Sequence, residues 1–264
     1  MNTLFYREAA PPADLGRLVL SFWEFTCMSD SPAPVEHEIF PDGCISLAYR
    51  RNDRLGINGL AVNSLHRRSV IIPVFGGDII WGMRLMPAAC ARVLGTDPAG
   101  WEPYRWNGTD EMFGIFDREF YETICHCGTL ESAIEVFSKR LRSLNIAPAD
   151  IDQKVLEAVS MIEHTMGEIR VADIAAHLGL SVRQFERRFK KSAGLSPKFY
   201  SRARRFRAAA AALATGGPVN WAARAAEMGF ADQAHLAREF SYLTDRSPRS
   251  FAEKVRAIDH GNLV

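Results

Sequence analysis

The sequence has few cysteines and no long apolar run, and each shortage excludes a class of protein. Its five cysteines are an odd number without regular spacing in 264 residues, which argues against a disulfide-framed domain and favours reduced thiols in a cytoplasm. The most apolar stretch, residues 70–90, is broken by prolines, glycines and charges, whereas a membrane helix needs about 20 apolar residues. The first residues lack a charged region followed by an apolar one, so we expect neither a secretory signal nor a membrane partner.

Signatures of catalysis and of metal binding are also missing from the sequence. It has no Gly-x-Gly-x-x-Gly, no phosphate loop and no Ser/His/Asp order at a known spacing. Cys125-His126-Cys127 is the one thiol and imidazole cluster, but a tetrahedral site needs a further ligand pair. We therefore expect no enzyme activity, no cofactor and no metal. The less favoured alternative is a DNA-alkylation response protein with Cys44, Cys125 or Cys127 as the nucleophile.

The sequence also has almost no net charge, since its 32 Lys and Arg residues are balanced by 31 Asp and Glu residues. The balance hides an asymmetry: residues 1–150 carry a net charge of −5 and residues 151–264 a net charge of +6. Between Arg183 and Arg207 there are ten basic side chains against the single Glu186. Such a difference between halves indicates a basic module attached to an acidic domain.

Short alternating runs separated by turns dominate the first hundred residues. Apolar residues alternate in 18–23, in 45–49 after the Pro41-Asp42-Gly43 turn, and in 79–85 after Gly76-Gly77. Closely spaced short strands predict a small antiparallel barrel or sandwich. The period then changes to that of a helix over 130–144, which Thr129 can cap. We predict an N-terminal domain at 1–145 and a linker at 146–153.

The remaining residues, 154–264, are expected to be helical and contain an internal repeat of about fifty residues. In the first copy a helix ends at Gly179, where a left-handed conformation costs little. Ser181 and Gln184 then form a capping box, and Phe185 and Phe189 give the next helix a buried face. The second copy has Asp232 as its cap and Leu236 and Phe240 as the buried pair. These features predict two helix-turn-helix units, at 171–193 and 221–244.

With these motifs the last hundred residues resemble the AraC/XylS family of bacterial transcription regulators. The matching pattern is Ile174-Ala-Ala-x-Leu-Gly-Leu-Ser-x-Arg-x-Phe-x-Arg-x-Phe189, Gly194-x-Ser-Pro197, Met228-Gly-Phe-x-Asp-Gln-x-His-Leu-x-Arg-x-Phe240 and Ser247-Pro248-x-x-Phe251. The resemblance implies two subdomains joined by a long helix at about 197–213, each placing a recognition helix in the major groove of DNA. The sequence departs from the family at Asp245, where the first copy has Gly194, so we expect the second unit to contribute less specificity.

The fold class implied is α+β, with a β-rich, cupin-like N-terminal barrel carrying helices and an all-α C-terminal domain. The cupin-like likeness rests on Pro41-Asp-Gly-Cys-Ile-Ser-Leu47 and Trp81-Gly-Met-Arg-Leu-Met-Pro87. Four aromatic residues are candidates to line an effector pocket inside the barrel: Trp23, Trp81, Trp101 and Trp106.

The expected DNA contacts divide by chemistry. Arginine can donate two hydrogen bonds to guanine, glutamine can form two with adenine, and glutamate can accept one from cytosine. Lysines and the other arginines contact phosphates, which position the protein on the DNA without reading its sequence. The base-reading candidates, several of them carried over from the family, are Arg183, Gln184, Glu186, Arg187, Gln233, Ala234, His235 and Arg238. The phosphate candidates are Ser181, Arg188, Lys190, Lys191, Lys198, Arg202, Arg204 and Arg205.

Together these observations predict a cytoplasmic, sequence-specific regulator that binds double-stranded DNA. A small-molecule effector and RNA polymerase are candidate partners, and the chain is expected to form a homodimer. An effector or a partner would act by favouring one of two states of the DNA-binding domain. The alternative is a constitutive regulator whose N-terminal domain only dimerises.

Overall fold

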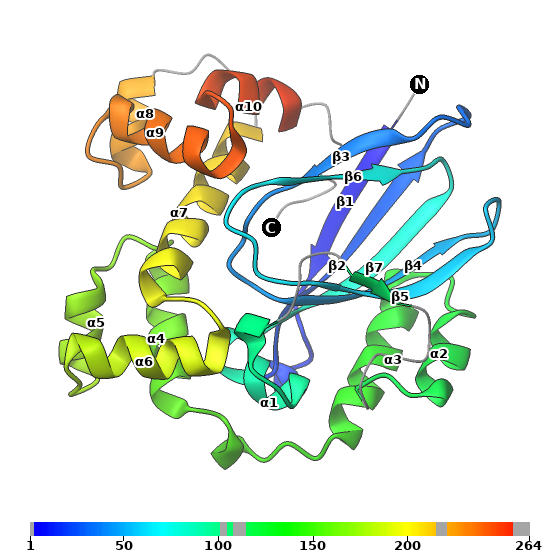
Figure 1. Cartoon of the computed structure of the whole chain (residues 1–264), viewed down its shortest axis with the longest axis horizontal. Coiled ribbons are helices and arrows are strands. Elements are labelled where there is room, and N and C mark those ends of the chain that lie inside the picture. The colour runs from blue at the N-terminus through cyan, green and yellow to red at the C-terminus, as the bar shows by residue number, and fades with distance from the viewer. Residues whose placement is uncertain (1–2, 101–104, 108–114, 215–220, 256–264) are drawn as a thin grey trace.

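The computed structural model describes residues 3–100, 105–107, 115–214 and 221–255. Strands fill the first part of the chain and helices the rest (Figure 1). This confirms the predicted α+β class, with a β-rich N-terminal part and a helical C-terminal part. No helix in the described ranges is long and apolar enough to cross a membrane.

The N-terminal domain is built on a six-stranded antiparallel sheet and a two-stranded ribbon. The sheet has the order β1-β2-β7-β4-β5-β8, and β3 pairs with β6 to form the ribbon. The runs predicted at 18–23, 45–49 and 79–85 fall in or beside three neighbouring central strands. The strands are β1 (Thr3–Ala9), β2 (Val19–Met28), β3 (Val35–Ile39), β4 (Ser46–Asn52), β5 (Ile57–Asn63), β6 (Val70–Val74), β7 (Asp78–Leu85) and β8 (Arg105–Asn107).

The two faces of the sheet have different coverings. One face packs against α2 (Arg118–Ile124) and α3 (Leu130–Ser143), the predicted helix, whose cap Thr129 accepts a hydrogen bond from the Ser132 amide. The other face packs against the ribbon, through a small core that includes Phe25 and Ile72. Register explains the division: β2 and β7 pair Trp23 with Gly82 and Glu24 with Trp81, so neighbouring side chains alternate between the faces.

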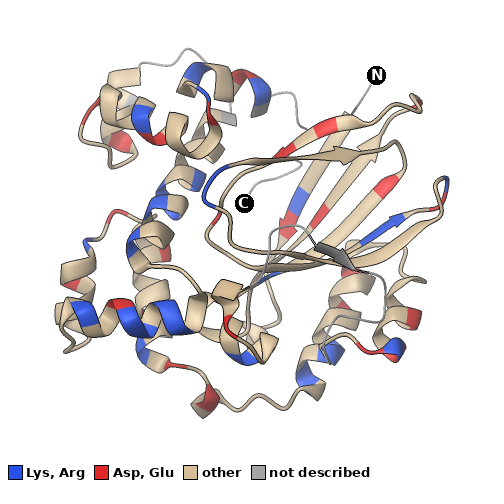
Figure 2. Ribbon diagram, in the orientation of Figure 1, with Lys and Arg blue, Asp and Glu red and all other residues tan. Residues whose placement is uncertain are grey.

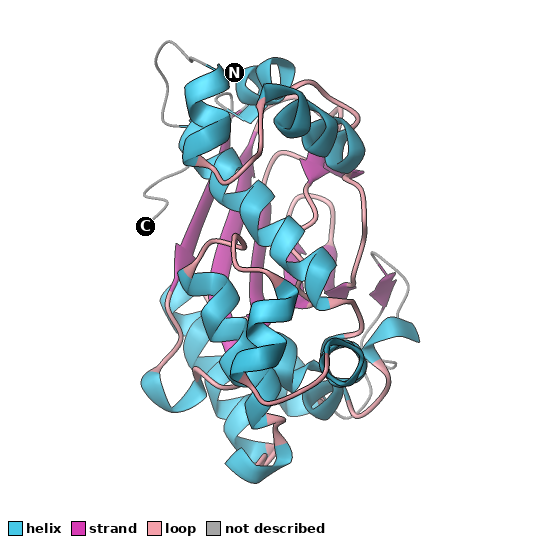
Figure 3. Cartoon of the chain, turned by 90° about the vertical axis from the view of Figure 1, so that its left-hand side faces the viewer, coloured by secondary structure: helices cyan, strands magenta, loops and turns pink. Residues whose placement is uncertain are grey.

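The helical C-terminal domain is arranged around one long helix, α7 (Pro197–Ala214), which lies between two groups of shorter helices (Figure 3). The remaining short elements are η1 (Ala13–Leu15) between β1 and β2, then η2 (Pro87–Ala89), α1 (Cys90–Leu94) and η3 (Pro98–Gly100) between β7 and β8, and η4 (Pro148–Asp150) between α3 and α4. The helices on either side of α7 are α4 (Gln153–His164), α5 (Val171–His177), α6 (Val182–Ala193), α8 (Trp221–Glu227), α9 (Gln233–Thr244) and α10 (Pro248–Val255).

Candidate nucleic-acid interface and the adjoining cavity

Helix α6 presents the most basic surface of the helical domain, and local chemistry explains its position. Gly179 turns the chain with φ of +63°, Ser181 accepts from the Gln184 amide, and the Gln184 side chain accepts from the Ser181 amide. The predicted capping box is therefore confirmed. Phe185 and Phe189 are fully buried, with ring centroids 5.8 Å apart. This pair fixes which face of α6 points outward.

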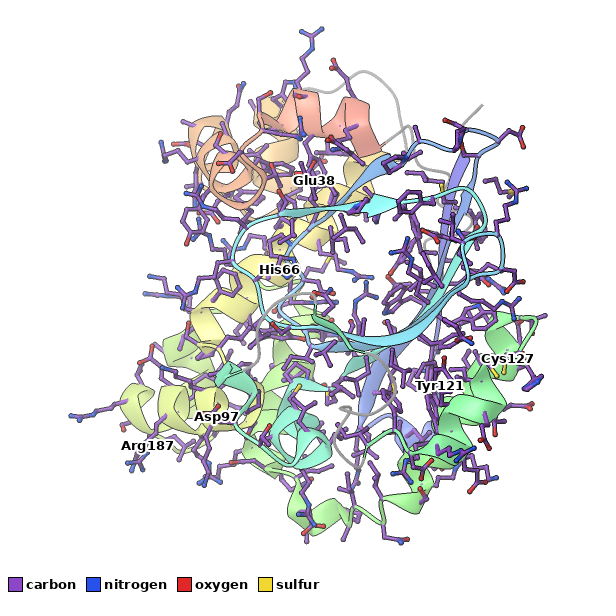
Figure 4. All side chains as sticks on the ribbon, turned by 45° about the vertical axis from the view of Figure 1, so that its right-hand side comes forward. Glu38, His66, Asp97, Tyr121, Cys127 and Arg187 are labelled. Atoms are coloured by element: carbon purple, nitrogen blue, oxygen red, sulfur yellow. The ribbon has the colours of Figure 1, made fainter. Side chains whose placement is uncertain are left out.

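Several residues predicted to contact DNA lie on the outward face of α6, and one more, Lys198, lies at the start of α7. Arg183, Glu186 and Arg187 are exposed, as are Lys190, Lys191 and Lys198. In Figure 2 the blue ribbon segments that mark Lys and Arg recur along α6, and Figure 4 shows Arg187 directed away from the molecule. Among the described residues no ion pair engages Arg183, Arg187, Lys190 or Lys191, so these cations are available to a polyanion.

Three predicted contact residues on or beside α6 already have structural partners. Ser181 and Gln184 are committed to the cap of the helix. Arg188 donates to Asp152, the cap of α4, at 2.9 Å. All three remain exposed, but a DNA contact from any of them has to compete with a bond within the protein.

The second unit repeats this arrangement with less charge. Asp232 accepts from the His235 amide at 2.6 Å, and Leu236 and Phe240 are fully buried, both as predicted. Gln233, Ala234 and Arg238 are exposed at the surface of α9 (residues 233–244). The helix ends at Asp245, which adopts φ of +55°, a left-handed conformation that a side chain takes only at a cost.

His235 differs from its predicted role in base reading. Its side chain is half-buried, with the ring centroid 5.5 Å from that of Phe230 and Nδ1 accepting from the Ala231 amide at 3.3 Å. The residue closes the turn between α8 and α9. The sequence could not show this, because the same spacing also places a residue at the edge of an outward face.

Three of the four predicted phosphate contacts on α7 form bonds within the protein, whereas Lys198 is exposed. Arg204 donates to Glu163 at 2.5 Å, and charge partners in this buried setting raise its pKa. Arg202 pairs with Glu239 and lies 3.8 Å from the centroid of the Tyr242 ring. Arg205 donates to the Gly167 carbonyl at 2.8 Å. These three arginines bond α7 to neighbouring parts of the helical domain. Their partners lie 37 to 41 residues away in the sequence.

The first helix-turn-helix unit contacts the N-terminal domain through close apolar packing. The C-terminal end of α6 abuts η2, α1 and η3. At that end Gly194 takes φ of +80°, and a Cβ there would lie 2.7 Å from Leu65 Cδ1 and 2.9 Å from the backbone nitrogen of Ala99. Only a glycine allows both the turn and this approach.

The second unit contacts the N-terminal domain through ion pairs. Glu38 of β3 is 4 % exposed and accepts from Lys254 at 2.6 Å and from Arg246 at 3.1 Å. The Ser69 amide donates to the carbonyl of Leu243, near the end of α9, at 2.7 Å. Arg68 pairs with Asp245 at 3.2 Å. The β3–β6 ribbon and the loop before β6 thus hold the second unit (Figure 4).

A cavity of about 210 Å³ lies where the sheet, the ribbon and the helical domain meet. Its walls come from the inner sheet face, from β3, from α7 and from Phe251 of α10. A polar network closes one side: Arg84 donates to Asp42 at 2.6 Å and pairs with Glu8 at 2.9 Å, and Arg207 of α7 also pairs with Glu8. These neighbours hold the pKa of the Glu8 carboxyl well below its ordinary value, against the effect of burial.

The Pro41-Asp42-Gly43 turn contacts both the sheet and α7 beside this cavity. Asp42 accepts from Arg84 and from the Cys44 amide. Gly43 has φ of +76°, and a Cβ there would lie 2.8 Å from the Tyr200 ring of α7. The sequence pattern predicted this turn, but it did not predict the contact between the turn and the helical domain.

Two of the four predicted pocket tryptophans, Trp23 and Trp81, lie on opposite faces of the sheet. Trp23 lines the cavity. Trp81 is completely buried on the opposite face, where it stacks on Tyr49 and donates to Glu24, because its register partner on β2 is Glu24 rather than Trp23. Trp101 lies outside the described residues, and Trp106 belongs to β8, where only the backbone is described. Sequence reasoning missed the charged residues of the cavity, which come from four separate segments.

Two of the three candidate nucleophilic thiols are buried, whereas Cys125 is half-buried and its Sγ lies 3.3 Å from Nδ1 of His126. Cys44 is 2 % exposed, and burial raises the pKa of its thiol well above the ordinary value, which disfavours the nucleophilic thiolate. Cys127 is 6 % exposed. Within the described ranges no three His, Cys, Asp or Glu side chains gather as a metal site would require. Burial therefore argues against Cys44 and Cys127 as nucleophiles.

Comparisons with known proteins agree with the helical part of this description. Residues 174–254 match a family model described as a helix-turn-helix domain, which takes in both α6 and α9. Residues 7–104 match a domain of unknown function, DUF6597. No curated protein matches the chain.

Solved structures also match. An AraC-type regulator from Chromobacterium violaceum is 27% identical, with coverage of 39% of this chain and 92% of its own and a TM-score of 0.34. ToxT from Vibrio cholerae is 12% identical, with coverage of 97% of both chains and a TM-score of 0.44. A fatty-acid-bound ToxT is 11% identical, with coverage of 98% of this chain and 97% of its own and a TM-score of 0.44.

Proposed function

We propose that the chain is a transcription regulator of the AraC/XylS family that reads a specific DNA sequence under the control of its N-terminal domain. The match of residues 174–254 to a helix-turn-helix model supports a DNA-binding regulator. The finer proposal concerns which residues read bases and what sets the state of the DNA-binding domain.

The observation that carries the proposal is the set of exposed cations on α6 that form no ion pair with any described residue, Arg183, Arg187, Lys190 and Lys191. Arg183 and Arg187 stand on the exposed side of a helix whose other side is fixed by Phe185 and Phe189. Arginine can donate two hydrogen bonds to guanine in the major groove. Lys190 and Lys191, one turn further along the helix, supply charge for phosphates. On α9 we assign base contacts to Gln233, Ala234 and Arg238, but not to the half-buried His235.

Control by the N-terminal domain is supported by the cavity. Both domains line it, since Trp23, His37 and Arg84 come from the sheet domain while Arg207 and Phe251 come from the helical domain. A molecule bound there touches both domains at once. It can favour one arrangement of the recognition helices only if it binds that arrangement more tightly. This favours control by an effector over an N-terminal domain that only dimerises.

The test separates specific from non-specific contacts. Once footprinting has located a binding site, Arg187→Ala should cost about 1–3 kcal/mol at that site and relax the preference at one base pair. Lys191→Ala is the matched control on the same helix, and it should weaken all sequences alike and lower the salt slope by about one. If both variants weaken all sequences equally, the assignment of Arg187 to base reading is wrong.

A further inference from the structure

The chemistry of the cavity indicates what kind of molecule fits it. Most of the wall is apolar and much of it aromatic, contributed by Tyr6, Trp23, Phe25, His37, Phe40, Phe206 and Phe251. An apolar protein cavity of about 150 Å³ is known to hold benzene. A cavity of about 210 Å³ therefore suits a substituted aromatic ring or a small bicyclic molecule.

The charged groups of the wall are neutralised by one another. Each nitrogen of Arg84 is engaged: Nε by Asp42 at 2.6 Å, Nη1 by Glu8 at 2.9 Å and Nη2 by the Tyr6 hydroxyl at 2.7 Å. Arg207 shares Glu8. Glu38 is bonded to Ser69, Arg246 and Lys254. A ligand carboxylate would have to break an existing ion pair to bind an arginine here, and a ligand cation would meet carboxylates already compensated.

Two neutral polar atoms beside the cavity have no such compensation. Asn63 Oδ1 and Trp23 Nε1 are buried and make no hydrogen bond to any described residue. Both residues line the cavity, Asn63 at the end of β5 and Trp23 in the middle of β2. A buried acceptor without a partner is costly. A ligand that donates to Asn63 removes that cost.

We propose that the cavity binds an uncharged aromatic molecule that donates a hydrogen bond, through N–H or O–H, to Asn63. This deepens the proposed function, because it names the class of effector and rests on the regulator's use of the cavity. Binding itself is independent of DNA and can be measured without it.

The experiment uses calorimetry on the full chain with three probes of similar shape. Indole is uncharged and has an N–H donor, 1-methylindole lacks the donor, and indole-3-acetate carries a carboxylate. We expect indole to bind at least about tenfold more tightly than either of the others. In Asn63→Leu the preference for indole over 1-methylindole should disappear. Stronger binding of indole-3-acetate, or an unchanged preference in Asn63→Leu, would overturn the proposal.

A second pair of variants tests the location. Ala211→Phe places a ring in the cavity from α7 and should abolish indole binding. Ala208→Phe, on the same helix but outside the cavity wall, should retain it. Equal loss in both, or no binding of any probe to the native chain, contradicts the proposal. Footprinting of the same preparation reports on the regulator itself, so intact DNA binding without indole binding rejects only the ligand.

Discussion

The two helix-turn-helix units share the same local construction, yet different chemistry holds each against the N-terminal domain. The first is held by close packing at Gly194, next to Leu65 and Ala99. The second is held by Glu38 and its two cationic partners, with Arg68 and Asp245 at the edge. Packing is insensitive to salt, whereas ion pairs at partly exposed positions weaken as salt rises. We therefore expect the second unit to be the one that can change position.

The same comparison holds for the surfaces offered to DNA. The exposed face of α6 carries Arg183, Arg187, Lys190 and Lys191, while α9 exposes Arg238 as its only cation. The firmly held unit thus supplies most of the electrostatic attraction, and the unit held by ion pairs supplies less. Acidic residues of the N-terminal domain, Glu38 among them, are the partners that restrain the basic domain.

The largest effect is expected from the packed contact. Gly194→Ala should reduce the free energy of unfolding by about 2–5 kcal/mol, combining about 1–2 for a side chain in the left-handed region with about 1–3 for overpacking against Ala99. Gly179→Ala is the matched control, since it also has positive φ but nothing within 4 Å of the added Cβ. Gly179→Ala should lose only about 1–2 kcal/mol, the cost of a side chain in the left-handed region. Equal losses, measured by urea unfolding, would show that the packed contact contributes nothing.

The ion-paired contact should give a smaller and more local effect. Glu38→Gln leaves Arg246 and Lys254 without their carboxylate and should cost about 1.5–3 kcal/mol. Hydrogen exchange should speed up in α9 and α10 and stay unchanged in α6. High salt should reproduce part of this effect in the native chain. Glu36→Gln, exposed on the same strand, is the control, and faster exchange in α6 as well would mean that the two units are not held separately.

The smallest effect is expected from pH. Burial, aided by nearby Lys254, lowers the pKa of His37 from 6.5 to about 4, although Glu38 acts in the opposite direction. Between these values the unfolded chain binds more protons than the folded one, so stability falls as pH decreases from about 6.5 to about 4. In His37→Gln the melting temperature should depend less steeply on pH in that window. His126→Gln, at an exposed position, is the matched control variant.

Local patterns in the sequence predicted the elements, because their causes lie within a few residues. The capping box of Ser181 and Gln184 and the buried pair Phe185 and Phe189 depend on spacings of three and four. The roles of Arg204 and His235 could not be predicted in this way. The neighbouring residues in the sequence do not distinguish an exposed arginine from one that bonds to a distant glutamate. Arg204 is of the second kind, and its partner Glu163 lies 41 residues away.

The cavity was beyond prediction for a related reason. Trp23 and Trp81 are equally apolar, and only the register between β2 and β7 decides that they face opposite sides of the sheet. Likewise the charged wall depends on Arg207 meeting Glu8 across 199 residues. Residue types indicated a pocket in the N-terminal domain, whereas the folded chain forms it jointly with α7 and α10.

Strand β3 contacts both the cavity and the second recognition unit within five residues. His37 packs against Phe25 beside the cavity, with ring centroids 4.2 Å apart, and the neighbouring Glu38 binds Arg246 and Lys254. Under the proposed function, effector and operator therefore act on one shared strand, and linkage makes their effects equal in both directions. Comparing the affinity for the effector with and without operator DNA would then reveal whether the effector promotes or opposes DNA binding, before any target gene is known.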